Sequence, residues 1–430
     1  MSSAGVRLGL RQNSAQFALL VAVNAFVGAM VGLERSTLPL IGEDEFGLTS
    51  GAALMSFIAA FGLAKSLTNL GAGAFAERIG RKRLLVLGWA LALPVPLLIA
   101  LAPSWGWVVL ANLFLGLNQG LAWSMTVVMK VDLVGRERRG LALGLNESAG
   151  YGGVALAAAA SGWLASELAA REVLVAAGAG IAVAGLVVSA RFVRDTAAHV
   201  AIEQGPRAPE SSPASLREAF GEVTWRVPEL RSCSQAGLVN NLGDALAWGI
   251  VPLFLAARDA SAAEVGLVAG LYPAVWATAQ LGTGYWSDRV GRKPLIVSGM
   301  LLQAAALALL AASGGAVGLA AVSAVMLGAG TALVYPTLIA AISDAVAPVD
   351  RAPAVGVYRF WRDMGYVAGG LGAGLAADAL GYRGAIWVVS ALTVASGVWA
   401  AFDLRERRLE PPRPAAALAG DGRRAPAGQL

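Results

Sequence analysis

The chain has 430 residues, of which 57% are hydrophobic and only 14% are charged. Soluble domains carry about 25% charged residues, so this composition excludes an ordinary soluble protein and favours one embedded in lipid. The net charge of +5 reflects membrane topology rather than a nucleic-acid partner. One cysteine (Cys233) and one histidine (His199) exclude an intramolecular disulfide and argue against a His/Cys metal centre.

Apolar runs near the ~20 residues that cross a bilayer occur along the whole chain. The clearest lie at residues 15–33, 84–101, 173–193, 295–312 and 384–402. Seven others carry scattered polar residues, as expected of helices that line an aqueous path; they lie at residues 51–75, 107–129, 140–164, 236–256, 264–286, 317–342 and 354–377. The sequence therefore predicts an all-α integral membrane protein with twelve transmembrane helices.

Six of the runs precede a polar stretch and six follow it, which predicts two six-helix bundles. We expect the first bundle over residues 1–195 and the second over residues 233–404. Residues 196–232 are rich in Pro, Ser, Glu and Arg and read as a cytoplasmic linker with one amphipathic helix at 216–230. The tail at 405–430, rich in Pro, Ala, Gly and Arg, is expected to be disordered.

The positions of Lys and Arg predict the orientation, because basic loops stay on the cytoplasmic side. Basic residues crowd the N-terminus at Arg7 and Arg11, the loop after the second run and the C-terminus, whereas alternate loops are acidic or bare. Both termini should therefore face the cytoplasm, in a multi-pass protein of the inner cell membrane. The first run lacks a convincing signal-peptide cleavage site, so we expect it to be a mature helix.

A ten-residue pattern occurs once in each half of the chain. Gly73-Ala-Phe-Ala-Glu-Arg-Ile-Gly-Arg-Lys82 returns as Gly284-Tyr-Trp-Ser-Asp-Arg-Val-Gly-Arg-Lys293, each time after the second run of its half. At nearly the same offset, Arg139 and Gly144 return as Arg351 and Gly356. Two patterns that recur at nearly the same distance along the sequence indicate a single ancient duplication.

This arrangement resembles the major facilitator superfamily of secondary transporters, over essentially the whole chain. The resemblance implies two parallel six-helix repeats with a solute site near the membrane midplane between them. Two departures are visible: Glu77 stands where the family usually has Asp, and Asn112 stands where many relatives carry an arginine used in proton coupling. No Walker motif, dinucleotide fingerprint or nucleophile elbow is apparent, so we expect neither an enzyme nor a cofactor.

The repeated motif predicts a cytoplasmic gate. A carboxylate and an arginine at helix ends can pair and cap those ends, which would hold the two halves together on one side, and glycine permits tight turns. The alternative is that the basic residues only set the topology. The expected gate residues are Gly73, Glu77, Arg78, Gly80 and Arg81 in the first copy, and Gly284, Asp288, Arg289, Gly291 and Arg292 in the second.

Ionisable side chains deep within a span are costly and are usually kept for function. Asp244 lies roughly ten residues into the seventh run, near mid-membrane at ~1.5 Å per residue, and is the first candidate for a proton-binding carboxylate. Glu147 and Asp363 are further candidates for proton coupling. The alternative for Asp244 is a structural ion pair or a helix-packing acid.

The duplication places Glu147 opposite Arg359, so the two halves carry opposite charges at equivalent positions. Either these two pair across the cavity, or Arg359 or Arg362 binds an anionic solute group through its fork of donors. Glu34 and Arg35 are expected to be outer-gate or interface charges. The expected solute-binding residues are Asn24, Lys65, Asn118, Gln119, Asn146, Asn240, Asn241, Trp276, Tyr335, Arg359 and Arg362.

The expected function is secondary active transport of a small solute by alternating access, coupled to protons. An anionic solute is favoured because Lys65, Arg359 and Arg362 are available. One alternative is proton-driven efflux of amphipathic or toxic compounds. Another, from a different class, is a non-transporting membrane sensor or assembly factor on the same fold, although the linker is too small for an output domain. The expected partners are the solute, H⁺ and the lipid bilayer, and we expect a monomer.

Overall fold

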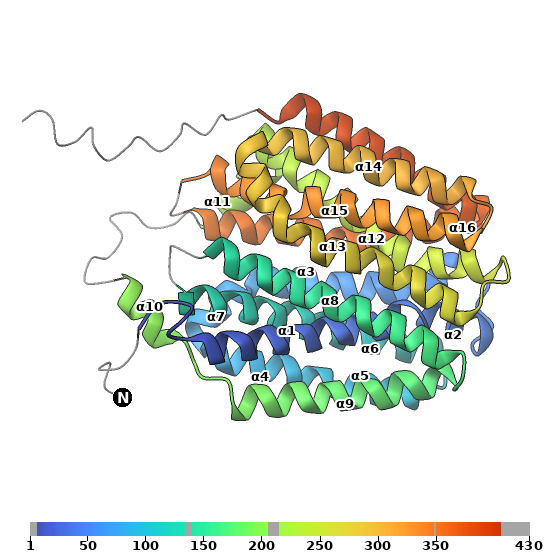
Figure 1. Ribbon diagram of the computed structural model, residues 1–430, viewed down its shortest axis with the longest axis horizontal. Helices are drawn as coiled ribbons and strands as arrows, with labels where there is room; N and C mark the ends of the chain where they lie inside the picture. Colours follow the sequence, from blue (N-terminus) through green and yellow to red (C-terminus); the bar gives the residue numbers. More distant parts are fainter. Residues whose placement is uncertain (1–6, 135–138, 205–214, 348–349, 406–430) are drawn as a thin grey trace, which may run out of the picture.

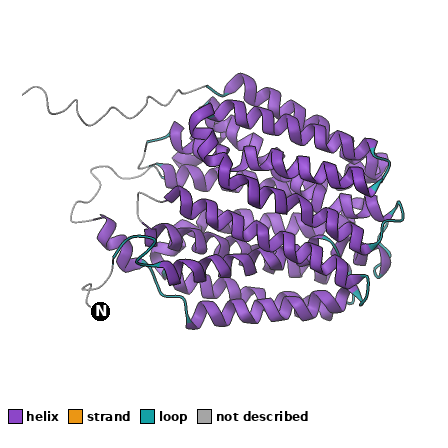
Figure 2. Cartoon of the chain, viewed as in Figure 1, coloured by secondary structure: helices purple, strands orange, loops and turns teal. Residues whose placement is uncertain are grey.

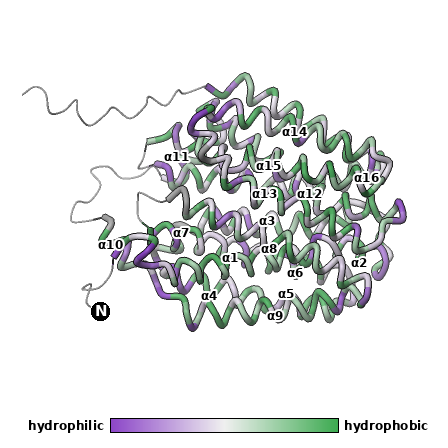
Figure 3. The backbone as a smooth tube through the Cα atoms, in the orientation of Figure 1, coloured by the Kyte–Doolittle hydropathy of each residue, from purple (hydrophilic) through white to green (hydrophobic). Residues whose placement is uncertain are grey.

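The computed structural model describes residues 7–134, 139–204, 215–347 and 350–405. Long helices run side by side along one direction, and the described ranges contain no strand (Figures 1 and 2). Hydrophobic residues dominate along the helices, whereas hydrophilic residues gather at the two ends of the molecule (Figure 3). This distribution is the one expected of a protein that spans a bilayer.

The described part of the first half contains ten helical segments. They are α1 (Ser14–Arg35), α2 (Leu38–Asp44), α3 (Gly51–Ile79), α4 (Arg81–Ala92), α5 (Pro94–Ala100), α6 (Trp105–Asn118), the π-helical η1 (Gln119–Trp123), α7 (Ser124–Val134), α8 (Arg139–Ala165) and α9 (Ala170–Arg191). The third expected span is interrupted between α4 and α5, because Pro94 has no N–H for the helix ladder. The fourth contains the π-helical turn η1 between α6 and α7.

The second half follows a short linker. The linker contains α10 (Ala197–Gln204), α11 (Leu216–Gly221) and the π-helical η3 (Glu222–Arg226), and the second half contains α12 (Pro228–Ala256), α13 (Ala262–Val290), α14 (Arg292–Ala312), α15 (Val317–Ala345) and α16 (Arg351–Asp403). The helix expected at 216–230 is thus divided among α11, η3 and the start of α12. Val227 is extended, as a residue before proline prefers to be, so the chain breaks there.

The twelve spans form two six-helix bundles. Within the described residues, ten helical stretches are long and apolar enough to cross a membrane, and one of them is the 53-residue α16. This helix consists of two spans joined at Gly381, where φ is 72°. Counting α16 twice and adding the 27-residue α8 gives the expected number.

The molecule has two distinct ends, which we call the motif end and the far end. The motif end holds Gly80, Gly291, α10 and α11, and the far end holds α2 and the turn at Gly381 (Figure 1). Gly80 and Gly291 each separate two helices with φ of 96° and 100°. Residues with a Cβ rarely adopt this left-handed region, so the second glycine of each motif copy is required by the same sharp turn.

The halves contact each other mainly through two helix pairs, α3 with α16 and α8 with α13, and α12 adds smaller contacts with α2 and α3. At the far end these pairs meet backbone to backbone. A methyl group placed on Gly162 of α8 would lie 2.5 Å from Gly266 Cα of α13, and one on Gly374 of α16 would lie 2.6 Å from Ala52 Cα of α3. These distances are shorter than any normal carbon contact, so only glycine permits this approach.

A proline interrupts the hydrogen-bond ladder of α15 beside this interface. Pro336 lies inside the helix and has no N–H to donate to the carbonyl of Ala332, four residues earlier. The Thr283 hydroxyl of α13 donates to that carbonyl at 2.7 Å instead. The buried carbonyl therefore keeps a partner, supplied by the neighbouring helix.

Candidate functional site

A cavity of about 470 Å³ lies between the two halves and reaches from the motif end to the middle of the molecule. Asp288 and Arg292 lie at its outer part, and Glu147, Tyr335 and Arg359 lie at its inner part. α8 of the first half forms one wall, and α13, α15 and α16 of the second half form the others. Its remaining lining is Leu143, Gly144, Gln280, Leu281, Ser287, Pro336, Ile339, Ala340 and Ser343.

A second, much smaller cavity follows deeper in the molecule. Its volume of about 10 Å³ is close to the minimum that holds one water molecule. Tyr335 and Arg359 line both cavities and therefore form the boundary between them. The other residues around the small cavity are Lys65, Asn69, Trp123, Ser124, Tyr151 and Arg362.

Glu147 is the carboxylate at the inner end of the large cavity, and both of its oxygens accept hydrogen bonds. Oε1 accepts from Trp123 Nε1 at 2.8 Å and from Asn146 Nδ2 at 3.1 Å. Oε2 accepts from the Tyr335 hydroxyl at 3.1 Å. Because Tyr335 belongs to the second half, Glu147 connects the two bundles.

Arg359 was expected either to pair with Glu147 or to bind solute. Among the residues that the structure describes, Arg359 makes no ion pair, and its buried Nε has no hydrogen-bond partner. Glu147 is held by other groups, so the pairing is not found in this conformation. The guanidinium faces both cavities with its charge uncompensated by a contact.

Arg362 and Asp363 form a buried ion pair at 2.7 Å. Arg362 also donates to the Tyr335 hydroxyl at 2.6 Å. Asp363 accepts from Asn69 Nδ2 of α3 at 2.5 Å and from Asn241 Nδ2 at 3.3 Å. A continuous hydrogen-bonded network thus runs from Glu147 through Tyr335, Arg362 and Asp363 back to the first half.

Lys65 is a cation of the small cavity whose neighbours are aromatic. Its Nζ lies 5.4 Å from the ring centroid of Phe61, 5.7 Å from that of Trp123 and 5.3 Å from that of Tyr366. No ion pair of Lys65 occurs within the described ranges. Cation–π contacts stabilise a buried ammonium without neutralising it, so Lys65 adds a second uncompensated positive charge to the site.

Asp244 lines neither of these two cavities and is 1% exposed. The Tyr272 hydroxyl of α13 donates to Oδ1, and the Tyr366 hydroxyl of α16 donates to Oδ2 at 3.4 Å. Its partners are thus phenol groups rather than a cation. The sequence placed Asp244 near mid-span, and its two hydrogen-bond partners come from α13 and α16 of the second half.

Most of the predicted amides hold helices together instead of lining the cavities. Asn24 donates to the Asn146 carbonyl at 2.7 Å, Asn118 to that of Gly88 at 2.9 Å and Gln119 to that of Val27 at 2.6 Å. Asn240 accepts from Gln303 at 3.0 Å. The amides that line the two cavities are Asn69 and Gln280.

An aromatic cluster closes the site between the halves. Tyr151 of α8 stacks on Trp276 of α13 with ring centroids 3.5 Å apart, and Trp276 meets Tyr335 edge-on at 5.0 Å. Trp276 and Tyr335 were predicted, whereas Tyr151 and Trp123 were not assigned to the site. A signal for Tyr151 exists, because it follows Glu147 by four residues and so lies on the same helix face.

Three gate residues, Arg81, Asp288 and Arg292, make ion pairs within their own half. Arg81 Nε lies 2.7 Å from Asp132 in the first half. Arg292 lies 2.6 Å from Asp288 and 3.0 Å from Asp344 in the second half. The remaining gate residues are Arg78 and Arg289, exposed at the motif end, and Gly73, Glu77 and Gly284, whose surroundings lie outside the described part of the chain.

Comparison with known proteins identifies the family. A family model described as Major Facilitator Superfamily matches residues 15–228 and 234–428. A curated relative, named "Probable 4-methylmuconolactone transporter" from Cupriavidus pinatubonensis, is 30% identical over 237 residues, which are 53% of this chain and 52% of the relative. The match thus spans about half the length of that relative.

Solved structures show the same fold. The nucleoside transporter NupG is similar with a TM-score of 0.72 over 89% of this chain and 98% of its own, at 14% identity. A POT family transporter in complex with a thioalcohol-conjugated peptide gives 0.72 over 89% and 94%, also at 14% identity. The match of the family model along both halves supports the assignment: the chain belongs to the major facilitator superfamily.

Proposed function

We propose that the protein moves a small organic anion across the inner membrane by alternating access, driven by a proton gradient. The observation that carries the proposal is Arg359, whose guanidinium faces a cavity of about 470 Å³ without an ion pair among the described residues. An arginine fork matches a carboxylate with two parallel hydrogen bonds. A bound anion would supply the partner that the protein does not.

The charge balance around the cavities supports an anion. Lys65 and Arg359 both lack a contacting carboxylate in the described structure. Glu147 is engaged by Trp123, Asn146 and Tyr335, and Asp363 is engaged by Arg362. The three cations Lys65, Arg359 and Arg362 outnumber the two carboxylates Glu147 and Asp363, so the excess charge that a solute would meet at the inner end of the cavity is positive.

The walls of the large cavity favour a solute with a compact apolar body. Its apolar lining includes Leu143, Leu281, Pro336 and Ile339. Small-molecule sites combine such walls with a few polar groups that fix orientation. The curated relative is named for transport of 4-methylmuconolactone, a small organic compound, which agrees with this class of solute.

Asp244 and Glu147 are the proposed sites of proton coupling. Neither makes an ion pair with a described residue, so each can exchange a proton without breaking one. Asp363 is bound to Arg362 and has to lose that contact first. A proton on Glu147 would also weaken its bond with Tyr335, which connects the halves.

Solute flux into liposomes tests the choice of an anion. The purified chain is reconstituted, a pH gradient is imposed, and uptake of a panel of organic acids, sugars, amino acids and amphipathic compounds is measured. Arg359→Gln should lower saturable uptake of the acids about tenfold or more, as loss of a charge-assisted pair predicts. The control Arg258→Gln, whose guanidinium donates to Gly314 at the far end, should stay within about twofold. Undiminished acid uptake by Arg359→Gln would show that the solute is not an anion held there.

Proton coupling has its own test in the same liposomes. Asp244→Asn should retain exchange of solute down its gradient and lose accumulation driven by the pH gradient. Its control is Asp403→Asn, which alters an ion pair with Arg231 at the motif end. If Asp244→Asn still accumulates solute as the control does, Asp244 is not the coupling residue.

A second candidate function is proton-driven efflux of amphipathic compounds. The mainly apolar walls of the large cavity favour it. Neutral amphipathic members of the same panel decide between the two, because efflux predicts their saturable transport and no dependence on Arg359.

A further inference from the structure

Arg35, the last residue of α1, is a buried cation without a partner. It is 0% exposed, and none of its three guanidinium nitrogens has a hydrogen bond in the described structure. Buried charges are almost always paired, because an isolated ion in a low dielectric is costly. An exception of this kind calls for a physical explanation.

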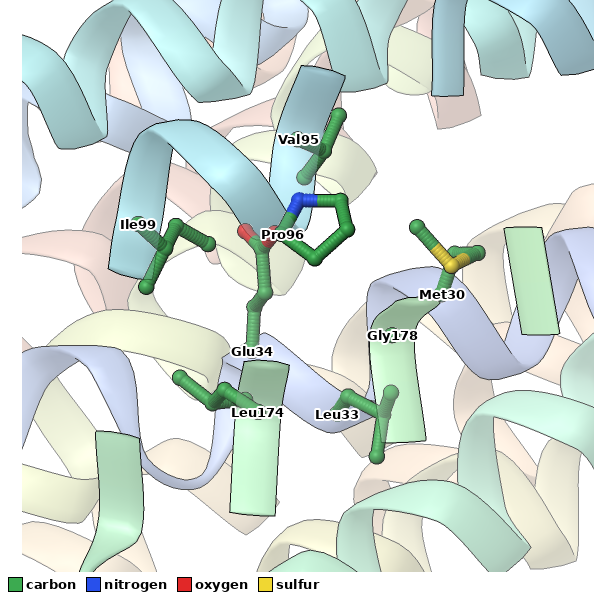
Figure 4. Close-up of a pocket in the computed structure, with 8 residues that line it drawn as sticks. All are labelled: Met30, Leu33, Glu34, Val95, Pro96, Ile99, Leu174 and Gly178. Carbon is green, nitrogen blue, oxygen red and sulfur yellow. The ribbon is translucent and has the colours of Figure 1, made fainter. Parts of the chain in front are cut away.

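The adjacent carboxylate does not provide the missing partner. Glu34 points into an apolar pocket formed by Val95, Pro96 and Ile99 of α5 and by α9 (Figure 4). Successive residues of a helix point about 100° apart, so the two charged groups diverge. No ion pair between Glu34 and Arg35 is found among the described residues, and one oxygen of Glu34 also lacks a partner.

Aromatic rings surround the guanidinium instead. Arg35 Cζ lies 5.2 Å from the ring centroid of Phe57, 4.6 Å from that of Phe61 and 5.3 Å from that of Trp248. Phe57 and Phe61 come from α3, in the same half as Arg35, whereas Trp248 comes from α12 in the opposite half. The surroundings of Arg35 are therefore divided by the interface that must open during transport.

This cation lies in line with the solute site. The Phe61 ring contacts Arg35 on one side and lies 5.4 Å from Lys65 Nζ on the other. Trp248 stacks on Tyr366 with centroids 5.5 Å apart, and Tyr366 reaches Asp244. Arg35 is thus one aromatic ring beyond Lys65, toward the far end.

We propose that Arg35 is the anion-binding residue of an entry site in the conformation that opens the far end, where it takes a carboxylate carried on a flat, apolar body. Separation of the halves lifts Trp248 away and leaves the guanidinium between Phe57 and Phe61. The fork of donors suits the carboxylate, and the two rings suit the apolar body. When the far end closes, Trp248 moves back over the Arg35 guanidinium. This movement displaces the anion toward Lys65. This proposal rests on the proposed transport of an organic anion.

Cysteine labelling of the full chain in liposomes tests the entry site without a known solute. In a Cys233→Ser background, which removes the sole cysteine, Phe57→Cys is labelled with an anionic sulfonate and with a cationic ammonium methanethiosulfonate of similar size. The anionic-to-cationic rate ratio should fall about tenfold when Arg35→Gln is added, because a nearby charge attracts one reagent and repels the other. Arg35→Lys should preserve the ratio within about threefold, since the charge remains.

A control position isolates the effect of Arg35. Leu143→Cys reports on the motif-end cavity, and its rate ratio should not respond to Arg35→Gln. An unchanged ratio at Phe57→Cys, or no labelling there from either side of the membrane, overturns the proposal.

Benzoate and benzamide test the class of ligand. Benzoate should slow the labelling of Phe57→Cys when Arg35 is present and have no effect with Arg35→Gln, whereas neutral benzamide should have no effect in either chain. Equal protection by the two compounds, or no protection by benzoate, overturns the assignment to a flat carboxylate.

The two proposals fail in different ways. If the anionic-to-cationic rate ratio is unchanged by Arg35→Gln in a chain that transports organic acids, only the proposal of the entry site is wrong. If the ratio depends on Arg35 but no acid in the panel is transported, the entry site stands as an anion site and the proposed function is wrong.

Discussion

The two ends of the interface between the halves differ, although the same helices build both. At the far end, α8 packs against α13 and α3 packs against α16 through glycine backbones. A methyl group added to Gly162 or Gly374 would lie only 2.5 or 2.6 Å from a Cα atom of the facing helix. Asp378 of α16 also accepts hydrogen bonds from Ser50 Oγ at 2.9 Å and Gly51 N at 2.5 Å, so it caps α3 of the other half. At the motif end, the large cavity separates α8 from α13, α15 and α16.

The comparison shows how one set of helices can be closed at one end and open at the other. Small residues allow close contact at the far end, whereas Leu143 and Ile339 border open space at the motif end. The ion pairs of Arg81 and of Asp288 with Arg292 stay within a half in this conformation. Four substitutions break or sharpen this contrast, and they follow from the largest expected effect to the smallest.

Gly374→Ala should break far-end closure. The new methyl group would lie 2.6 Å from Ala52 Cα and 2.8 Å from the Gly51 carbonyl oxygen, which are both backbone atoms, so the helices would have to separate. We expect solute flux in liposomes to fall about tenfold or more, because alternating access requires each end to close. Full flux in this variant would mean that the close contact is not needed for the cycle.

Gly291→Ala tests the turn at the motif end. A left-handed backbone is unfavourable by about 1–2 kcal/mol for a residue with a Cβ, and Gly291 has a φ of 100°. The variant should lose stability by that amount in thermal unfolding of the purified chain. Gly80→Ala, at the equivalent turn of the first half, should lose a similar amount, and a difference between them would show that the two copies are not structurally equivalent.

Asp378→Asn should loosen the far end more mildly. The carboxylate caps the N-terminus of α3 with three hydrogen bonds, the third from Ala52 N at 3.2 Å, but it is exposed, so the expected effect is up to about fivefold. The rate of labelling at Phe57→Cys measures the open fraction. The matched control is Asp403→Asn, whose ion pair with Arg231 lies within the second half. Equal labelling rates in the two variants would show that Asp378 does not hold the far end closed.

Gly356→Ala is the counterpart of Gly374→Ala on the same helix. Nothing lies within 4 Å of the position that its methyl group would occupy. We expect flux within about twofold of the unmodified chain and a gain of up to about 1 kcal/mol in stability, because alanine favours a helix over glycine. A large loss of flux would show that α16 is sensitive to side chains along its whole length, and the contrast between the ends would then disappear.

The sequence was sufficient to predict the fold because its evidence is local. Hydropathy marked the spans, and the repeated motif marked two equivalent turns that the structure places at Gly80 and Gly291. The break before Pro228 was missed, although the proline is visible, because the amphipathic pattern at 216–230 continues across it. Periodicity reports which face of a helix is apolar, not whether its backbone is continuous.

The site was less predictable because its contacts join helices that are distant in the sequence. The repeat places Glu147 and Arg359 at equivalent depths, but depth does not determine which way each side chain turns. Trp123 and Tyr335, which lie on two other helices, donate hydrogen bonds to the Glu147 carboxylate. Arg35 was expected among outer-gate or interface charges, and its proposed role depends on Trp248, which no spacing rule connects to α1.

At Pro336, the hydrogen bond to the Ala332 carbonyl comes from Thr283 of α13 instead of from the backbone of α15. Bending of α15 at this point would therefore break no hydrogen bond of its own backbone. When an ordinary helix bends in lipid, it exposes backbone carbonyls that have no hydrogen-bond donor there. The Ala332 carbonyl already accepts a hydrogen bond from Thr283. Pro336 also borders the large cavity, so a bend of α15 at this point would reshape the cavity wall while the Ala332 carbonyl kept its partner on α13. Such a bend would move α13 and α15 together, and opening of the cavity would then not require each half to move as a rigid body.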